Sequence, residues 1–406
     1  MRLLEHWTHG GKTFDKVRTQ ATPTGTASLG GGVDVPTGAP ALIIHAGRVR
    51  SYWGFSHTGL FSLYYALHNG TITVGTSKFE VSQKSKTTAK QCEAGVIYVF
   101  SGVDVKRYNY PKASWLSTPT DHPETLAECA DELESYLIEA AEDLATVYGT
   151  KKAAVLLSGG TDSTMTVLAL KAAGYEVKTF SVGTSREVYD PSHAERYASI
   201  LGVEYEFVQV PAHDFELQRL LEEALLMAEL RDFSNILMAC CTALALRVIK
   251  QQGFTLVFHG YFADMLVGND TYIYPDFNRE FPVGSPTRTD AAWSTHRIKK
   301  CTHITNNTLW LDALSTCNGM QWATLFNHPL IQGFLFWLPM RLLPVGQPKH
   351  LYWQLLDQYI DNGAWHDTRK IGFYTGSGIG TVRLKNPILQ DANIRDTSTR
   401  IFKEAK

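Results

Sequence analysis

The stretch Ala153–Thr164, Ala-Ala-Val-Leu-Leu-Ser-Gly-Gly-Thr-Asp-Ser-Thr, contains the residues best suited to chemistry on a phosphate group. Two adjacent glycines carry no Cβ atoms that would keep a phosphate away from the backbone N–H groups. Serines on both sides add hydroxyl donors, and a carboxylate can hold Mg²⁺ on the phosphates. The loop has no lysine and lacks the G-x-x-x-x-G-K-[ST] spacing, so it is not a Walker A loop. The residues predicted to bind the pyrophosphate are Leu157, Ser158, Gly159, Gly160, Asp162 and Ser163.

A buried strand and a helix must position this loop. The continuous apolar run Ala153–Leu157 is typical of a strand in a parallel sheet that is covered on both faces. An apolar-rich helix, Met165–Ala173, follows the loop, and its start offers free N–H groups and a positive dipole end to an anion. The alternative is a tight strand-to-helix turn in which Asp162 caps the helix and no ligand binds.

Bulk composition limits the classes of function. With 406 residues the chain can form two domains with substantial cores. A formal net charge of −2 argues against a dominant surface for nucleic acid or for an anionic membrane. Six scattered cysteines without a C-x-x-C spacing indicate free thiols in a reducing compartment rather than a zinc site or a disulfide framework. No signal core and no membrane-length apolar run is present, so the predicted location is cytoplasmic.

Strand and helix patterns alternate after residue 121, and this alternation predicts an α/β fold with a doubly wound parallel sheet. Ligands bind such sheets at the carboxyl ends of the strands, where the loop lies. The predicted strands are 153–157, 177–182, 205–210 and 254–259, and the predicted helices are 123–148, 162–173, 191–201, 216–230 and 234–252.

The first 120 residues contain short β-like runs separated by turn signals, which predict a smaller mixed α+β domain. Ala41–His45, Thr71–Val74 and Gly95–Phe100 are the predicted strands, and Gly59–Tyr65 is a candidate short helix. We therefore expect two domains, 1–120 and 121–406.

The run S-G-G-x-D-S after a strand resembles the pyrophosphate loop of the ATP pyrophosphatase superfamily. Members of that superfamily split ATP into AMP and pyrophosphate while they activate an acceptor as its adenylate. The resemblance implies ATP and Mg²⁺ as cofactors and a fold like that of the adenine nucleotide α-hydrolases.

Two further segments resemble the asparagine synthetase branch of this superfamily. The second predicted strand ends at Val182 and Gly183, where backbone groups could meet the adenine edge, and Asp190 then begins a D-x-x-x-A-x-x-x-A-x-x-L-G pattern. Gly260–Gly268 resembles the family's G-D-G-A-D-E-L-F-G segment, with Gly260 and Asp264 in register.

This second match implies that Asp264 is the carboxylate that faces Asp162 across Mg²⁺, since two carboxylates plus phosphate oxygens suit this cation. The alternative for Asp264 is a helix N-cap. Tyr261, Phe262 and Met265 depart from the family pattern, which leaves the metal site poorer in carboxylates.

The chain after residue 278 contains three more candidate segments. Lys370-Ile-Gly-Phe resembles the family's K-x-G-F segment, whose lysine faces the reacting carbonyl and the leaving pyrophosphate; a solvated surface lysine is the alternative. The run Gly376–Gly380 is interpreted as a flexible lid. A basic stretch between 279 and 301 could close over phosphates, but a solvated loop is the preferred interpretation; its residues are Arg288, Arg297, Lys299 and Lys300.

Two departures change the expected chemistry. Asparagine synthetase-like enzymes carry an N-terminal glutaminase whose nucleophile is a cysteine directly after Met1, whereas here Arg2 follows. We therefore expect residues 1–120 to be a degenerate glutaminase-like (Ntn-type) domain without glutamine hydrolysis, as in β-lactam synthetases. In the family's G-x-E-x-R-x-P-F segment, Gln321 stands at the Glu position, where it can hydrogen-bond but cannot act as a general base, and Ala323 replaces the Arg.

The sequence thus predicts an AMP-forming amide-bond synthetase that adenylates a carboxylate and transfers it to ammonia or an amine. Its catalytic candidates are Lys370, Asp264 and Gln321. The expected partners are a small-molecule carboxylate and a nitrogen donor, with no membrane and no nucleic acid, although a nucleotide substrate stays open. Two alternatives are an enzyme that modifies a nucleobase or nucleotide by the same adenylation, and a non-catalytic ATP-binding homologue.

Overall fold

The computed structural model describes most of the chain from residue 123 onward and shorter pieces before it. The described ranges are 7–8, 26–29, 33–36, 51–54, 64–69, 71–75, 78–91, 96–101, 104–109, 123–228, 233–268, 273–304, 310–311, 314–315, 318–343, 349–360 and 373–404.

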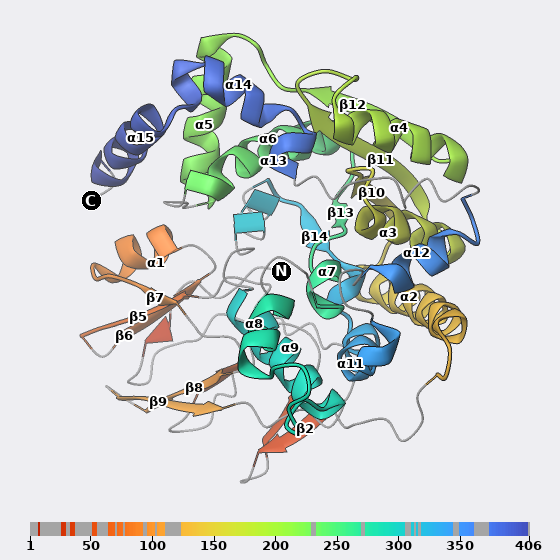
Figure 1. Ribbon diagram of the computed structural model, residues 1–406. Coiled ribbons are helices and arrows are strands. Elements are labelled where there is room, and N and C mark those ends of the chain that lie inside the picture. The colour runs from red at the N-terminus through yellow and green to blue at the C-terminus, as the bar shows by residue number, and fades with distance from the viewer. Residues whose placement is uncertain are drawn as a thin grey trace.

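A five-stranded parallel sheet forms the centre of the fold (Figure 1). Its strand order is β12-β11-β10-β13-β14, and every neighbouring pair is parallel. The strands are β10 (Lys152–Leu156), β11 (Glu176–Gly183), β12 (Glu204–Gln209), β13 (Leu256–His259) and β14 (Gln321–Ala323). Chain order reverses between β10 and β13, and such a switch point opens a crevice at the carboxyl ends of the two strands. The predicted doubly wound α/β fold is confirmed.

Helices cover the sheet and explain why β10 is apolar after Lys152. Ala153, Ala154 and Val155 have no exposed surface. The neighbouring strand β11 is contacted by three helices, α3 (Thr161–Ala172), α4 (Tyr189–Leu201) and α6 (Phe233–Gln251). A strand without a solvent-facing side needs no polar alternation, so a continuous apolar run was the appropriate signal.

Helix α2 (Leu126–Tyr148) leads into the sheet and has well-defined ends. Thr125 and Glu128 form a capping box at its start, and Gly149 ends it in the left-handed conformation with φ 68°. Its buried residues recur at helical spacing, and they pack against α3 and against α12 (His350–Leu356).

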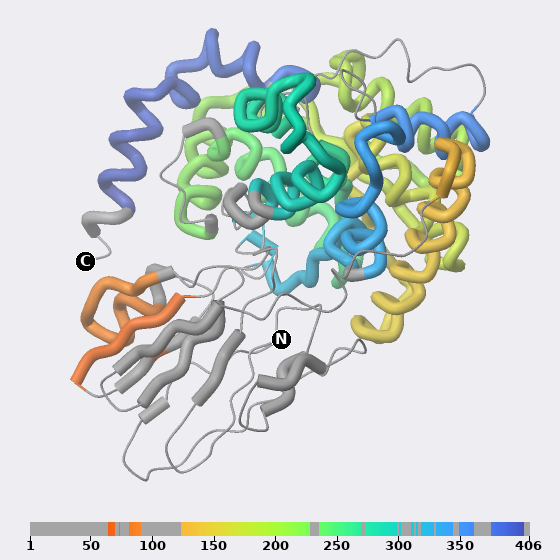
Figure 2. The backbone as a smooth tube through the Cα atoms, turned by 60° about the horizontal axis from the view of Figure 1, so that its bottom comes forward, coloured from red at the N-terminus to blue at the C-terminus, as the bar shows by residue number. Residues whose placement is uncertain are grey.

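The other helices after residue 200 surround these elements. Helix α15 (Asp391–Glu404) lies along the outside of the molecule next to α5 (Asp214–Ala228), as Figures 1 and 2 show. Asn393 Nδ2 on α15 donates to Gln218 Oε1 on α5 at 3.0 Å. None of the helices in the described part of the chain is both long and apolar enough to cross a membrane. The remaining helices are α7 (Ala263–Leu266), α8 (Ile273–Glu280), α9 (Asp290–Ile304), α11 (Pro329–Trp337), α13 (Phe373–Gly376) and α14 (Ile379–Lys385).

The described residues among the first 110 form small antiparallel sheets and the helix α1, which agrees with the predicted mixed α+β organisation. The sheet orders are β1-β6-β5-β7, β4-β8-β9 and β2-β3. The candidate helix 59–65 is wrong at its end, because Tyr64 and Tyr65 begin strand β5; the candidate strand 41–45 lies outside the described residues. The elements are β1 (Trp7–Thr8), β2 (Thr26–Leu29), β3 (Val33–Pro36), β4 (Ser51–Gly54), β5 (Tyr64–His68), β6 (Thr71–Gly75), α1 (Lys78–Ser85), β7 (Lys90–Gln91), β8 (Val96–Ser101) and β9 (Asp104–Asn109).

Arg297 shows that the interpretation of 279–301 as a solvated loop is wrong. This residue lies on α9 and is 0% exposed. Its Nη1 donates to the carbonyl oxygens of Leu266 at 2.7 Å and Leu335 at 2.8 Å, and its Nη2 to those of Phe336 at 2.6 Å and Leu338 at 3.1 Å. Burial lowers the pKa of Arg297 to about 9, which still leaves it charged at pH 7. The guanidinium joins the ends of α7 and α11.

The interpretation of Gly376–Gly380 as a flexible lid is also wrong. All five of these residues are buried, and they lie at the end of α13 and the start of α14. The thiols of Cys129, Cys240, Cys241 and Cys301 are free and buried, as the cysteine spacing predicted.

Replacing Arg297 by Leu should destabilise the protein strongly, because four buried carbonyl groups would lose their donors. We expect a loss of about 3–5 kcal/mol in the free energy of unfolding, measured by urea denaturation. The matched control is Arg279→Leu, since the Arg279 side chain is 79% exposed and should contribute less than about 0.5 kcal/mol. Equal losses in the two variants would contradict a clamp at Arg297.

Candidate functional site

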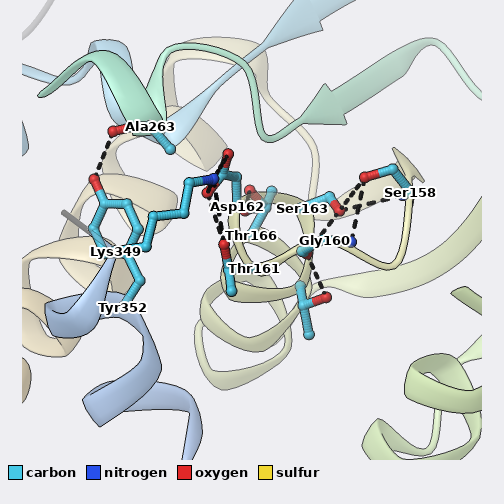
Figure 3. Close-up of polar contacts among 10 residues, drawn as sticks. Ser158, Gly160, Thr161, Asp162, Ser163, Thr166, Ala263, Lys349 and Tyr352 are labelled. Carbon is cyan, nitrogen blue, oxygen red and sulfur yellow. Dashed lines mark hydrogen bonds and ion pairs between the residues drawn. The ribbon is translucent and has the colours of Figure 1, made fainter. Parts of the chain in front are cut away.

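The Ser-Gly-Gly-Thr-Asp-Ser loop adopts an open turn between β10 and α3 (Figure 3). Gly159 has φ +72°, a left-handed conformation that favours glycine. Gly160 is the N-cap of α3, so the interpretation of Asp162 as the cap does not hold, and no side chain bonds the first turn at this cap. The start of α3 therefore keeps its capacity to bind an anion.

The two serines hold the loop in shape. Ser158 N–H donates to Ser163 Oγ at 3.2 Å, and the two hydroxyl oxygens are also 3.2 Å apart. Ser163 Oγ donates in turn to the carbonyl oxygen of Gly160 at 3.2 Å. The sequence predicts that the hydroxyl groups of Ser158 and Ser163 bind pyrophosphate. In the structure the same hydroxyl groups also hold the loop backbone in place through hydrogen bonds.

Close backbone packing explains two of the glycines. An ideal Cβ on Gly159 would lie 2.4 Å from His193 Cβ of α4. A Cβ on Gly260 would lie 2.4 Å from the backbone nitrogen of Ser163 and 2.5 Å from the carbonyl carbon of Asp162. The segments after β10 and β13 are therefore in direct contact at the switch point.

Lys349 is a site residue that the sequence analysis missed. Its Nζ lies 2.6 Å from both Oδ1 and Oδ2 of Asp162 and 3.4 Å from Thr161 Oγ1 (Figure 3). The Lys349 and Asp162 side chains are only 17% and 21% exposed. The sequence contains only a weak indication of this role. Lys349 and Tyr352 are three residues apart, a spacing that places two side chains on one face of a helix.

Asp162 and Asp264 both act on Tyr352. The hydroxyl of this buried tyrosine donates to the carbonyl oxygen of Ala263 at 2.7 Å. Burial, and then the charges of Asp162 and Asp264, hold the pKa of Tyr352 well above its usual range. Asp264 lies in the first turn of α7, whose N-cap is Phe262, so the alternative role of Asp264 as a cap is not observed. Both predicted metal carboxylates therefore lie near enough to Tyr352 for their charges to raise its pKa.

This donor set fits a Mg²⁺ ion that arrives with a nucleotide. Within the described ranges no group of three or more His, Cys, Asp or Glu side chains could hold a metal ion alone. Asp162 and Asp264 would supply one carboxylate each and the phosphates the remaining oxygens, which is a common arrangement for Mg²⁺. Lys349 occupies both Asp162 oxygens in this structure, so it competes for the same carboxylate.

The residues predicted to border the adenine, Val182 and Gly183, make backbone and packing contacts that the sequence did not indicate. Val182 and Gly183 lie in the β11–β12 ladder, and the carbonyl oxygen of Gly183 accepts the N–H of Val210 at 2.8 Å. A Cβ on Gly183 would lie 2.6 Å from Pro191 Cγ, so this glycine lets α4 approach the strand. Adenine binding by these two residues stays a prediction.

The structure does not bring the catalytic candidate Gln321 to the loop. Gln321 pairs in register with Leu256 at the start of β13, three residues before His259 at the carboxyl end. Lys370 lies outside the described residues. The catalytic roles of Gln321 and Lys370 stay predictions. The position of Gln321 at the start of β14 argues against direct contact with the phosphates.

Aromatic residues line the sheet beside the loop. His259, at the end of β13, stacks on Trp322 with ring centroids 4.7 Å apart. Its Nδ1 accepts the N–H of Tyr261 at 3.1 Å, and burial lowers the pKa of His259 to about 3. Burial also raises the pKa of Tyr261 to about 12, with a contribution from Asp264. Both side chains are therefore neutral at pH 7.

Replacing Gly260 by Ala should displace the loop, because the new methyl group would meet backbone atoms that cannot rotate away. We expect a loss of about 1–3 kcal/mol in stability and at least a tenfold weaker ATP affinity, since a displacement of ~1 Å can cost about 100-fold in function. The contrasting variant is Gly160→Ala, whose methyl group would lie 3.4 Å from Ser158 Oγ and should cost less stability. Thermal unfolding and ATP titration measure both effects, and a Gly260→Ala protein with unchanged ATP affinity would contradict the packing argument.

Comparison with known proteins places this site in a family. Residues 137–322 match the family model described as asparagine synthase. No curated protein sequence gives a significant match.

Three solved structures are similar at low identity. A predicted tRNA methyltransferase subunit from Methanocaldococcus jannaschii is 14% identical, with 43% of this chain and 67% of that chain covered and a TM-score of 0.22. An NH3-dependent NAD synthetase from Campylobacter jejuni is 12% identical, with 46% and 96% covered and a TM-score of 0.28. A U34-tRNA thiolase from Methanococcus maripaludis with a [4Fe-4S] cluster is 12% identical, with 73% and 82% covered and a TM-score of 0.30.

The family match spans β10 to β14 and includes the loop, Asp162 and Asp264. Residues 137–322 are thus identified as an asparagine synthase domain, a type of domain found in the PP-loop ATP pyrophosphatase superfamily.

Proposed function

We propose that this protein is an ATP-dependent amide-bond synthetase that releases AMP and pyrophosphate. It adenylates a small-molecule carboxylate and transfers the acyl group to ammonia or an amine. The single observation that supports this most strongly is the cluster at the switch point, where the phosphate loop, two carboxylates and one ammonium group come from three separate chain segments.

In this proposal the loop residues bind the β- and γ-phosphates through backbone N–H groups, with Ser158 and Ser163 as additional donors. Mg²⁺, when bound, would draw negative charge from the phosphate oxygens. Asp162 and Asp264 are its proposed ligands. Lys349 is the proposed counter-charge for the leaving pyrophosphate, because its long flexible stem can move the ammonium group from Asp162 to a phosphate oxygen.

The reaction balances in two steps. A carboxylate oxygen of the substrate attacks the α-phosphorus, and the bond from that phosphorus to the pyrophosphate oxygen breaks. The amine nitrogen then attacks the acyl carbon, AMP leaves with the bonding electrons, and the nitrogen loses a proton. Lys370 is the predicted residue for charge at the acyl group, by its resemblance to the family's K-x-G-F lysine.

The domain division at residue 120 and the degenerate glutaminase-like character of the first part remain part of the proposal. The family match begins at residue 137 and lies wholly within the proposed synthetase domain. A nucleotide or nucleobase acceptor would use the same adenylation step, so the nature of the acceptor is a question for the substrate screen.

Isotope exchange between ATP and pyrophosphate across a panel of carboxylates tests the proposal. One carboxylate should support exchange, and Asp162→Asn and Lys349→Met should each lower its rate by about 100-fold or more, because each removes an electrostatic contact to the reacting phosphates. Lys385→Met is the matched control, since Lys385 is an exposed lysine on α14.

Two results would reject the proposal. ATP binding without exchange for any carboxylate or nucleotide would favour a non-catalytic ATP-binding protein. Exchange that survives in Asp162→Asn at the native rate would place the chemistry outside this loop.

A further inference from the structure

Asp190 is a buried carboxyl group with no assigned role in the reaction. It lies in the first turn of α4, next to the end of β11, and is 4% exposed. Its Oδ2 is buried without a hydrogen-bond partner. An unpaired buried polar atom costs about 1–3 kcal/mol, so its presence calls for a physical explanation.

The carboxyl group lies directly against the backbone of α13. An ideal Cβ on Gly376 would be 1.9 Å from Asp190 Oδ1 and 2.4 Å from Asp190 Cγ, so only glycine fits at this contact. The loop after β11 also contacts this segment, at Ser377 and Gly378. Thr184 N–H donates to the carbonyl oxygen of Ser377 at 3.0 Å, and a Cβ on Gly378 would lie 2.3 Å from Thr184 Oγ1.

These contacts couple two regions that are far apart in the sequence. Residues 376–378 fit against 184–190 through two glycines and a backbone hydrogen bond. The latter range follows directly after Val182 and Gly183, the predicted adenine edge. The docked position of the C-terminal segment therefore determines the shape of the strand end that would border a nucleotide.

The surroundings of Asp190 favour its protonated form. Burial raises the pKa of Asp190 to about 8 from an ordinary value of 3.8. From the neighbouring helix α6 it interacts with the thiol of Cys241, whose own pKa burial raises to about 12, so that group is neutral too. From α13 it meets the backbone of Gly376, and among the described residues no positive side chain contributes to its pKa. An ionised carboxylate would thus be buried without a compensating charge.

We infer that Asp190 is a positioning residue whose protonated side chain keeps residues 373–380 docked on the strand end at 182–184, and that its ionisation loosens this docking and weakens nucleotide binding. The nucleotide part of this inference rests on the proposed function. The docking part concerns the ligand-free protein and stands apart from it.

Stability should follow the ionisation of Asp190 in a defined direction. Because the folded-state pKa is raised, the stabilising contribution is fully present below about pH 3.8 and is lost as pH rises through about 8. Asp190→Asn keeps a neutral side chain of the same shape and should remove this pH dependence. Glu195→Gln is the control, because Glu195 is an exposed carboxylate on the same helix.

Hydrogen exchange of residues 373–380 tests the docking without any nucleotide. The quantity to compare is the exchange rate of the wild-type segment divided by that of the same segment in Asp190→Asn, measured at pH 7 and at pH 9. This ratio should be about tenfold larger at pH 9, because the docked state still loses proton-linked stability between pH 7 and the raised pKa of about 8. An unchanged ratio would overturn the inference, whatever the protein does with ATP.

ATP affinity gives the second readout. Between pH 7 and pH 9 the dissociation constant of the wild-type protein should rise about tenfold, while that of Asp190→Asn should stay constant. A parallel rise in both proteins would reject the link to nucleotide binding. Absence of ATP binding at every pH would instead reject the proposed function, and the exchange experiment would still decide the docking.

Discussion

The close contact between Gly260 and the backbone of Asp162 and Ser163 is the constraint on which the site depends. It joins the segments after β10 and β13 at the point where the strand order reverses, so that residues about 100 positions apart share one edge of the sheet. Any side chain at 260 would separate them, and the charges of Asp162 and Asp264 would then no longer meet at Tyr352. The strand order brings the two segments to one edge of the sheet, and the absence of a Cβ on Gly260 lets their backbones come into contact.

Much of this architecture could be predicted because its signals are local. The strand and helix ends from 152 to 251 lie within about two residues of the sequence-based limits, since caps, glycines and apolar runs mark them directly. Strand β14 has only three residues and no such run, so no local signal in the sequence marks it. Lys349 was missed because its partner is 187 positions away in the sequence, and Arg297 was misread because a charged residue predicts solvent unless its buried carbonyl partners are known.

Phe262 shows how strongly its surroundings define the loop after β13. This residue has φ 83°, a left-handed conformation that costs a bulky side chain of order 1–3 kcal/mol, and it stands where the asparagine synthetase pattern has glycine. The neighbouring bonds keep it there: Met265 N–H donates to its carbonyl oxygen at 3.2 Å, and Thr324 Oγ1 holds the carbonyl of Tyr261 at 2.8 Å. Its ring is 1% exposed, so burial of the ring offsets the backbone strain.

The residues around the loop after β13 divide the site into a charged side and a neutral side. Asp162, Asp264 and Lys349 carry formal charges next to the phosphate loop. On the other side, His259 and Tyr261 are neutral at pH 7 because burial shifts both pKa values away from neutrality, and Met265 is 4% exposed at a position where the family pattern has glutamate. Apolar and neutral groups strengthen electrostatic interactions nearby, because they exclude water. Under the proposed function, the charged side would stabilise charge on the phosphates while an uncharged acyl acceptor approaches from the aromatic side.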